Sequence, residues 1–433
     1  MKSKERAAAQ FSFLMATLAD QCDPRQKLVR LSKAIPWETF EEAFTEHYSD
    51  LGRPAKPIRL MVGLLLLKQL ENVSDEAVVE RWVQNPYYQL FCGMDQFQWD
   101  LPCDPSDLVY FRKRIGDEGA TLILAVTAQM HGKRAQEPEI VVDTTVQEKN
   151  ITHPSDTKLA RKIIQRCWKL AKQQGLKLRR RYCKEVRQHL MAQRWRKHPR
   201  RNKAARKGVR KLKTIAGRLI RELERKLPAD AMAGQRENFA LYQRVLRQKT
   251  KDKDKIYSLH EPGVYCIAKG KEHKKYEFGS KASVAMTKTH GVIVAASAHE
   301  ENIYDGHTLP EVLDLAEAVM AGRPSKAIVD RGYRGRKNID GTDILVPQRP
   351  PAGQSRSTKE KMRKRFRRRA AIEPVISHLK HDYRLVRCFL KGHLGDAINL
   401  KLAAAAWNLN KWMREVLFVL IQSLRIQLTT LRN

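Results

Sequence analysis

The chain has 433 residues, and its 83 Lys and Arg against 47 Asp and Glu give a formal net charge of +36. So large an excess goes beyond what solubility requires, and it predicts a polyanionic partner, in practice nucleic acid. The length allows roughly two to four domains with a sizeable core.

Cysteine usage and hydropathy exclude several other classes. The seven cysteines form no Cys-x-x-Cys pair and no Cys/His set at zinc spacing, which fits free thiols in a reducing cytosol. The apolar stretch Phe11–Ala19 is too short and lacks the cleavage site of a signal peptide. Leu60–Leu67 and Val416–Ile421 are too short to span a bilayer. We therefore expect a soluble protein.

Residues 1–135 are predicted to be mostly helical. Expected helices are Pro57–Leu70, a second capped by Ser74 and ending at Gln84, Ser106–Ile115 and Gly119–Met130, with Leu64–Leu67 deeply buried. A packed helical bundle and a DNA-end recognition module both fit, because no clear recognition helix stands out. In the second interpretation these cations face phosphate: Arg53, Lys56, Arg59, Arg112, Lys113 and Arg114.

Residues 156–255 form a strongly basic insertion. Between Lys158 and Lys255 there are 34 Lys and Arg against 7 Asp and Glu. Apolar residues nevertheless recur at helical spacing from Leu212 to Leu227, which favours folded helices over a floppy basic linker. Leu159–Gln174 and Leu178–Arg194 are predicted as further helices. We expect this insertion to grip the DNA backbone, with Arg179, Arg180 and Arg181 among its contacts.

Strand patterns return from residue 256. Val264–Ala268, Glu277–Met286 and Val292–Ala298 are predicted antiparallel strands, with a turn at His290-Gly291. Leu309–Met320 is predicted to be a crossover helix. Ala397–Leu424 is expected to form one or two helices.

Two aspartates close short, β-branched runs that are typical of buried strands. Asp143 ends Glu139–Asp143, and Asp330 ends Lys326–Asp330. Reactive groups collect at the carboxyl ends of parallel strands, so these acids are expected to meet there. With Glu373 they would hold two divalent cations that clamp the attacking and leaving oxygens of a phosphodiester.

The third carboxylate lies within a row of helical spacing. Phe366, Arg369, Glu373, Ser377 and Lys380 recur at steps of three and four, which would put them on one helix face. A carboxylate between cations suits a site where metal and phosphate meet. Because Pro374 is tolerated only near a helix start, the helix proper is expected to begin near Ile372.

The order of these elements is that of an RNase H-like mixed sheet interrupted after its first strand and flanked by helices. The chain resembles the DDE transposases of bacterial insertion sequences, of the insertion-sequence-five type. Blocks that carry the resemblance include Val142-Asp-Thr-Thr-Val, Tyr276-Glu-Phe-Gly-Ser-Lys, Asp305-Gly-His-Thr-Leu and Asp330-Arg-Gly-Tyr-Arg-Gly. The family's Tyr-x2-Arg-x3-Glu-x6-Lys motif matches Phe366, Arg369, Glu373 and Lys380, with Phe in place of Tyr.

The resemblance implies a transposase that cuts and joins DNA at terminal inverted repeats, with Asp143, Asp330 and Glu373 holding two Mg²⁺ ions, for which Mn²⁺ substitutes. Arg369 and Lys380 are expected to steady the DNA, and Arg331 and Arg334 to approach phosphate. A homodimer on DNA, in the nucleoid of the bacterial cytoplasm, is also implied.

An RNase H-like nuclease or resolvase without strand transfer, and a basic DNA-binding relic, remain alternatives. Asp305 is expected to be only a turn former or helix cap.

The predicted domains are an N-terminal helical DNA-end-binding domain, a catalytic core, a basic helical insertion and a C-terminal helix. Their ranges, in that order, are residues 1–135, 136–155 with 256–395, 156–255, and 396–433.

Overall fold

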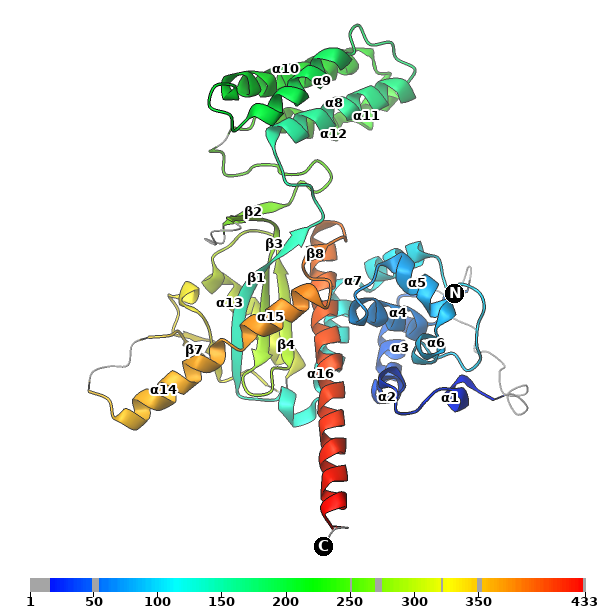
Figure 1. Ribbon diagram of the computed structural model, residues 1–433, viewed down its shortest axis with the longest axis vertical. Coiled ribbons are helices and arrows are strands. Elements are labelled where there is room, and N and C mark those ends of the chain that lie inside the picture. The colour runs from blue at the N-terminus through cyan, green and yellow to red at the C-terminus, as the bar shows by residue number, and fades with distance from the viewer. Residues whose placement is uncertain are drawn as a thin grey trace. The chain divides into compact units, whose positions relative to one another are not determined.

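The computed structural model describes residues 16–48, 54–249, 251–268, 275–320, 322–348 and 353–430, with side chains up to residue 416. Within it the chain forms two compact units, Met1–Glu148 with Ser280–Asn433, and Lys149–Gly279 (Figure 1). The second unit thus takes in residues 256–279, which the sequence assigns to the core. Arg53 and much of Phe11–Ala19 lie outside the described residues.

The first unit begins with helices. They are α1 (Leu18–Gln21), α2 (Lys27–Ala34), α3 (Trp37–Thr45), α4 (Ile58–Leu70), α5 (Asp75–Gln84), α6 (Pro86–Phe91), α7 (Pro105–Gln129) and the short 3₁₀ helix η1 (Gly132–Ala135). Ser74 caps α5 by accepting the Ala77 N–H, as predicted. Leu64–Leu67 are fully buried, also as predicted. The two helices expected between Ser106 and Met130 meet in α7 at a kink, where Gly116 has φ 63°.

Within the described residues, eight strands form one mixed sheet. They are β1 (Glu139–Lys149), β2 (Tyr265–Ala268), β3 (Tyr276–Thr287), β4 (Ile293–His299), β5 (Lys326–Ile328), β6 (Asn338–Ile339), β7 (Thr342–Leu345) and β8 (Arg387–Cys388). The order is β2-β3-β1-β5-β7-β6, with β4 on β3 and β8 on β1. β5 runs parallel to β1 and β7, while β3 is antiparallel to β2 and β4. This is the predicted RNase H-like fold.

The strands predicted from the sequence are present, but two of them end at other residues than predicted. β1 does not end at Asp143 but continues to Lys149, and β5 ends at Ile328, two residues before Asp330. β6, β7 and β8 were not predicted; Asp340 and Gly341, in the turn between β6 and β7, both have positive φ.

Alternation along β1 and β5 separates two cores on opposite faces of the sheet. Val141 and Ile328 pack in one core with Ile372 and Leu379. Their strand neighbours, among them Ile140 and Ala327, pack in the other core. The second core is covered by α13 (Asp305–Val319), the predicted crossover helix.

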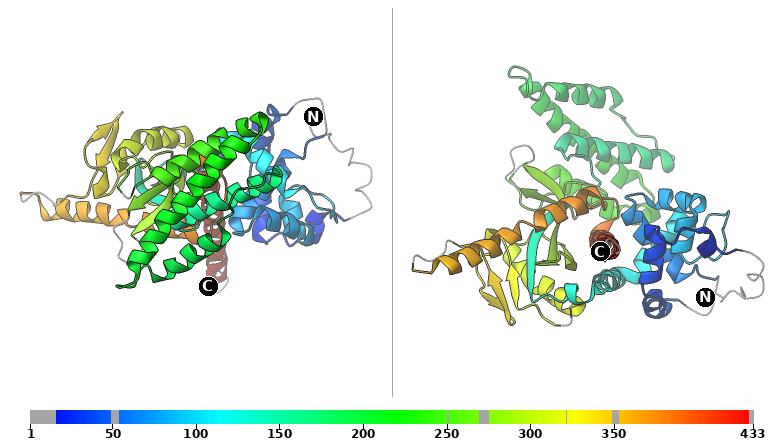
Figure 2. Two further views of the ribbon diagram at one scale, coloured as in Figure 1. Left: turned by 90° about the horizontal axis from the view of Figure 1, so that it is seen from above. Right: turned by 60° about the horizontal axis from the view of Figure 1, so that its bottom comes forward.

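Three helices complete the first unit. α14 (Arg356–Arg369) ends two residues before α15 (Ile372–His381), which begins at the predicted residue and packs on the sheet (Figure 2). α16 (Gly392–Thr430) is one long helix. It contributes Ile398 and Leu402 to the core of the N-terminal helices, and Leu400 and Ala403 to the sheet core. α16 therefore ties the two parts into one unit.

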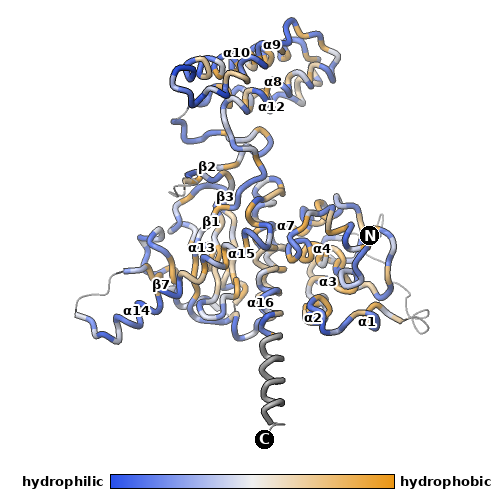
Figure 3. The backbone as a smooth tube through the Cα atoms, in the orientation of Figure 1, coloured by the Kyte–Doolittle hydropathy of each residue, from blue (hydrophilic) through white to orange (hydrophobic). Residues whose placement is uncertain are grey.

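The second unit is a helical bundle followed by β2. Its helices are α8 (Asp156–Gln173), α9 (Cys183–Ala192), α10 (Asn202–Lys226), α11 (Ala229–Ala233) and α12 (Arg236–Arg247), with the 3₁₀ turn η2 (Gln193–Trp195). The predicted row from Leu212 to Leu223 is fully or almost fully buried. Hydrophilic and hydrophobic residues alternate along these helices (Figure 3). Contrary to the prediction, residues 178–182 are not helical, and Tyr182 has φ 59°.

All seven cysteines are free thiols, as expected. Among the described residues, no helix combines the length and the apolar character needed to cross a membrane.

Candidate active site

Asp143 lies within β1, and Asp330 follows the end of the neighbouring parallel strand β5 by two residues. The register pairs Glu139 with Lys326 and Val141 with Ile328. Continued by two residues, the same register pairs Asp143 with Asp330. Neighbouring strands lie about 4.7–4.9 Å apart, so the two backbones are close at this point. β5 ends at Ile328 while β1 continues, which leaves both acids at the carboxyl edge of β5.

Both acids belong to the sheet face that α15 covers. Side chains two residues apart on a strand share a face, so Asp143 lies on the same side as Val141. Val141 packs in the core that also contains Ile372 of α15, the residue before Glu373. Packing of α15 on this face therefore brings Glu373 near Asp143, although the two residues are far apart in the sequence.

Arg369 joins Glu373 to Asp143 directly. One of its terminal nitrogens lies 3.6 Å from Asp143 Oδ2, and the other lies 3.2 Å from Glu373 Oε1. Arg365, one turn earlier, contacts Glu139 at the start of β1 at 3.4 Å. The last turn of α14 therefore lies along β1. Phe366 in the same turn packs against the sheet core, so the ring fills space where the family motif has Tyr.

Asp305 belongs to the same edge, and the prediction that it only forms a turn or cap is wrong. It is the first residue of α13 but makes no cap hydrogen bond to that helix. Its Oδ1 instead accepts from Thr144 Oγ1 at 3.0 Å and pairs with Lys281 Nζ at 2.6 Å. The sequence signal was available, because Lys281 and Asp305 both lie in blocks shared with the family. The spacing of Lys281 and Asp305 along the sequence does not show that their side chains interact.

The loop after β5 brings Asp330 close to Asp305. Asp330 Oδ1 accepts the Gly332 N–H at 2.6 Å. A Cβ added to Gly332 would lie 2.8 Å from Asp330 Oδ1 and 3.1 Å from Asp305 Oδ2. The two oxygens are therefore less than 6 Å apart, and both lie against the Gly332 backbone.

Tyr333 is buried beneath these acids. Burial, followed by the charges of Asp305 and Asp143, raises the pKa of its hydroxyl well above the usual value, so it remains neutral. Asp330 contributes in the same direction, and Thr144 opposes the shift. The hydroxyl has no partner in hydrogen-bonding geometry.

These residues fit a divalent cation in chemistry but not yet in arrangement. Carboxylate oxygens are the ligands that Mg²⁺ and Mn²⁺ prefer, and the unpartnered Tyr333 hydroxyl is a further oxygen beside them. In the described part of the chain, however, no three His, Cys, Asp or Glu side chains converge as a metal site. Arg369 pairs with Asp143 and Glu373, and Lys281 pairs with Asp305, so the protein's own cations offset the charges of these carboxylates.

The remaining cations predicted beside the site lie on its rim. Arg331 and Arg334 are exposed in the loop after β5, where Arg331–Tyr333 forms the 3₁₀ turn η3. Lys380 is half-buried in the last turn of α15, two turns after Glu373.

The predicted DNA contacts of the second unit are exposed in the loop between α8 and α9. Arg179 and Arg181 are both exposed. Arg180 is exposed too, but it pairs with Glu185 and lies 5.0 Å from the ring of Tyr182.

Arg112 does not face phosphate, which corrects the interpretation of the N-terminal helices. It is buried and pairs with Asp75 at 2.6 Å, and Lys68 pairs with the same carboxylate at 2.9 Å. Arg59 is half-buried over the ring of Trp37. Lys56, Lys113 and Arg114 are exposed.

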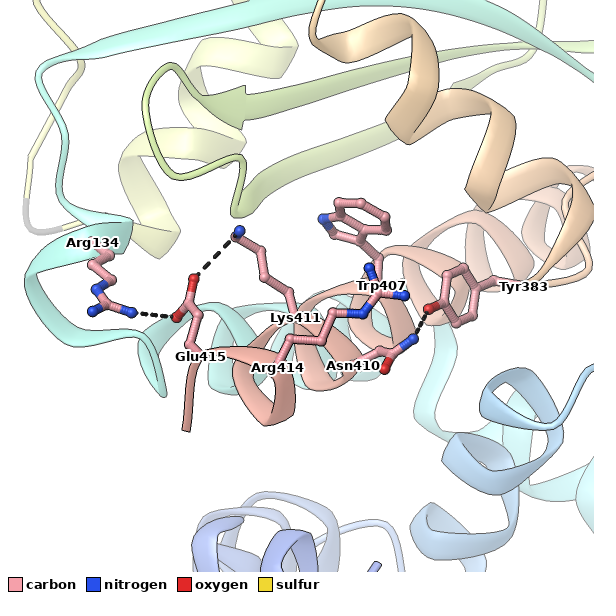
Figure 4. Close-up of a pocket in the computed structure, with 7 residues that line it drawn as sticks. All are labelled: Arg134, Tyr383, Trp407, Asn410, Lys411, Arg414 and Glu415. Atoms are coloured by element: carbon pink, nitrogen blue, oxygen red, sulfur yellow. Dashed lines mark hydrogen bonds and ion pairs between the residues drawn. The ribbon is translucent and has the colours of Figure 1, made fainter. Parts of the chain in front are cut away.

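A separate pocket of about 220 Å³ lies along α16 (Figure 4). Its lining residues are Arg134, Tyr383, Trp407, Asn410, Lys411, Arg414 and Glu415. Trp407 donates to the carbonyl of Gly291 in the β3–β4 turn. That turn lies at the start of β1, where Lys288 donates to the first residue of the strand. Asp143 is four residues further on, roughly 13 Å along β1, so the pocket is not part of the carboxylate site.

Comparison with known proteins points to one family. Residues 16–114 match the family described as Transposase domain (DUF772), and residues 244–409 match Transposase DDE domain. A Rhizobium meliloti protein, described as uncharacterized protein ORF8 in nfe locus, is 48% identical over 166 residues. The alignment covers 37% of this chain and 80% of that protein. No solved structure gives a significant match.

Proposed function

The chain belongs to the DDE transposases, and we propose that it cuts and joins DNA at the terminal inverted repeats of an insertion sequence of the insertion-sequence-five type. Asp143, Asp330 and Glu373 are the proposed catalytic and metal-binding residues. The observations that support this proposal are the parallel register of β1 and β5, which would pair Asp143 with Asp330 if extended by two residues, and the Arg369 contacts with Asp143 and Glu373.

The proposed cofactor is a pair of Mg²⁺ ions, with Mn²⁺ as a substitute. When bound, such a pair supplies a nucleophile at neutral pH and stabilises the leaving oxygen of a phosphodiester. The chain's own contribution is to fix three carboxylates on rigid elements. Asp143 lies within β1, Asp330 follows β5, and Glu373 is in the first turn of α15.

The cations around the site have a second proposed task. Arg369 pairs with Asp143 and Glu373, and its guanidinium is also suited to bind a DNA phosphate beside these carboxylates. Arg331 and Arg334 are exposed just after Asp330, and Lys380 follows Glu373 on α15, so these cations are proposed to extend the positive charge around the site. Duplex DNA is therefore the proposed substrate, both as terminal repeat and as target.

The basic second unit is proposed to hold the DNA backbone. Its folded core and exposed arginines support a rigid, sequence-independent grip. We propose that residues 1–135 recognise the terminal repeat. Three cations in this region, Lys56, Lys113 and Arg114, are exposed. A homodimer on DNA, in the nucleoid of the bacterial cytoplasm, is part of the same proposal.

A product assay separates this proposal from its alternatives. The purified chain is incubated with Mg²⁺, a donor duplex that carries the element's own end, and a supercoiled plasmid. Donor molecules joined to the plasmid support the transposase. Nicks or breaks without joining indicate a nuclease or resolvase. Binding without any cut indicates a DNA-binding relic.

A further inference from the structure

Asp305 is a further carboxylate at the edge of the site. It is not one of the three proposed metal-binding residues, Asp143, Asp330 and Glu373. Its side chain is 25% exposed, and that of its partner Lys281 is 12% exposed. Lys281 also donates to the Ile303 carbonyl at 2.6 Å, and Thr144 adds a hydroxyl to the same carboxylate oxygen. Asp305 Oδ1 is therefore firmly held, which fixes the direction of Oδ2.

Asp305 Oδ2 and Asp330 Oδ1 both lie against the backbone of Gly332. This close approach requires glycine, because a Cβ at residue 332 would lie 2.8 Å from Asp330 Oδ1 and 3.1 Å from Asp305 Oδ2. In the described part of the chain, Asp330 forms no ion pair of its own; its carboxylate accepts the Gly332 N–H. Two half-buried carboxylates this close favour a cation between them, because like charges at short range repel.

Tyr333 gives an independent indication of a ligand. Its side chain is only 1% exposed, yet its hydroxyl oxygen has no hydrogen-bond partner. Buried hydroxyls are rarely left without a partner in native proteins, so an unpartnered one indicates a missing water or ion. After burial, the charges of Asp305, Asp143 and Asp330 raise the pKa of this hydroxyl, while Thr144 lowers it, so the hydroxyl lies near all three carboxylates.

We propose that Asp305 is a fourth carboxylate of the active site and holds, together with Asp330, one of the divalent cations. This rests on the function proposed above. Lys281 and Thr144 position Asp305 from the other side, and Lys281 offsets its charge while the ion is absent. A purely structural Asp305–Lys281 pair would explain the contacts of Oδ1. It would not explain why Asp305 Oδ2 lies so near Asp330 Oδ1 or why the Tyr333 hydroxyl is unpartnered.

The test measures Mn²⁺ binding to the full chain without DNA, from the free-Mn²⁺ signal in electron paramagnetic resonance. Asp305→Asn is expected to weaken binding by about tenfold or more, the loss typical of residues that support a metal site. Asp314→Asn is the matched control, because Asp314 lies on the same helix but pairs with Arg323 at the surface. It should leave binding unchanged. Tyr333→Phe should weaken binding without lowering the melting temperature, since the lost hydroxyl has no partner in the protein.

Reference variants keep the two proposals distinguishable. Asp143→Asn should weaken Mn²⁺ binding if the proposed function is right. If Asp143→Asn weakens it and Asp305→Asn does not, the fourth carboxylate is refuted and the proposed function stands. If neither variant affects it, both are refuted. Should Asp305→Asn fail to fold, Asp305→Glu keeps the charge while moving the carboxylate by one methylene, and wild-type Mn²⁺ affinity in that variant would refute the proposal.

Discussion

Asp143 on β1 and Asp330, two residues after β5, fall at matching positions when the parallel register of the two strands is extended, although 186 residues separate them in the chain. A shift of one residue would move Val141 and Ile328, which are fully buried in one core, out of that core to the opposite face of the sheet. The hydrophobic packing that stabilises the sheet therefore also fixes the relative positions of β1 and β5, and with them the backbone at Asp143 and Asp330.

Removal of either aspartate charge should abolish DNA cleavage. Asp143→Asn and Asp330→Asn each keep the side-chain volume and remove a proposed ion ligand, so cleavage should fall by at least about 10²–10³-fold. Binding of the duplex should remain nearly intact, because the basic surfaces are unchanged. A cleavage assay on end-labelled DNA and a binding titration of the same preparations check both parts. Normal cleavage by either variant contradicts the assignment.

Glu373→Gln should separate activity from stability. The Glu373 side chain is 62% exposed, and its ion pair with Arg369 is open to solvent, so the pair contributes less than about 1 kcal/mol to folding. Loss of cleavage with an unchanged melting curve is the expected result. Glu360→Gln, which removes a similarly exposed partner of Lys364 on α14, is the control and should retain full activity.

The N-terminal helices should depend on the buried carboxylate of Asp75. Asp75→Asn leaves Lys68 and Arg112, both almost fully buried, without their partner, and should cost about 3–5 kcal/mol of unfolding free energy. Chemical denaturation measures this loss. Asp23→Asn, at an exposed pair with Arg25, is the control and should cause no measurable change.

The same residue gives a pH dependence of defined sign. Burial alone would raise the pKa of Asp75, but Arg112 and Lys68 outweigh it and lower the pKa below its ordinary value. A carboxyl whose pKa is depressed by folding stabilises the protein above its unfolded pKa. That contribution should therefore be lost as pH falls below about 4. In Asp75→Asn this part of the acid dependence should be missing, and an unchanged acid profile would contradict the assignment.

Sequence patterns were informative wherever a local signal determines the structure. Breakers bound the runs that end near Asp143 and Asp330, and Pro374 marks the start of α15 correctly. Burial of the row from Leu212 to Leu223 also follows from helical spacing.

Contacts between distant segments were not visible in the sequence. Arg112 resembles an exposed DNA-binding cation because its partner Asp75 is 37 residues away. In the sequence Asp305 resembles only the start of a helix. Its partners Thr144 on β1 and Lys281 on β3 contact it through the tertiary packing of these strands with α13. In both cases the sequence gives the charge of the residue but not the partner that decides its role.

The basic second unit should bind DNA through phosphates and without reading bases. Arg179, Arg180 and Arg181 lie exposed in one loop, so replacing all three with Gln removes phosphate contacts without opening the helical core. Each lost contact should flatten the slope of log K against log salt by about 0.9, giving a change of roughly two to three. We expect the slope to change by roughly two rather than three, because Arg180 already pairs with Glu185.

Fluorescence anisotropy over a salt series, with the element end and a random duplex of equal length, measures this slope. Affinity for both duplexes should fall alike, since phosphate contacts orient a protein on DNA but carry no sequence information. Lys213→Gln with Lys226→Gln is the matched control, because both lysines already pair with carboxylates in the same unit. Their replacement should change the slope much less. If the triple arginine variant instead loses its preference for the element end at an unchanged slope, the second unit reads bases and the assignment of recognition to residues 1–135 is wrong.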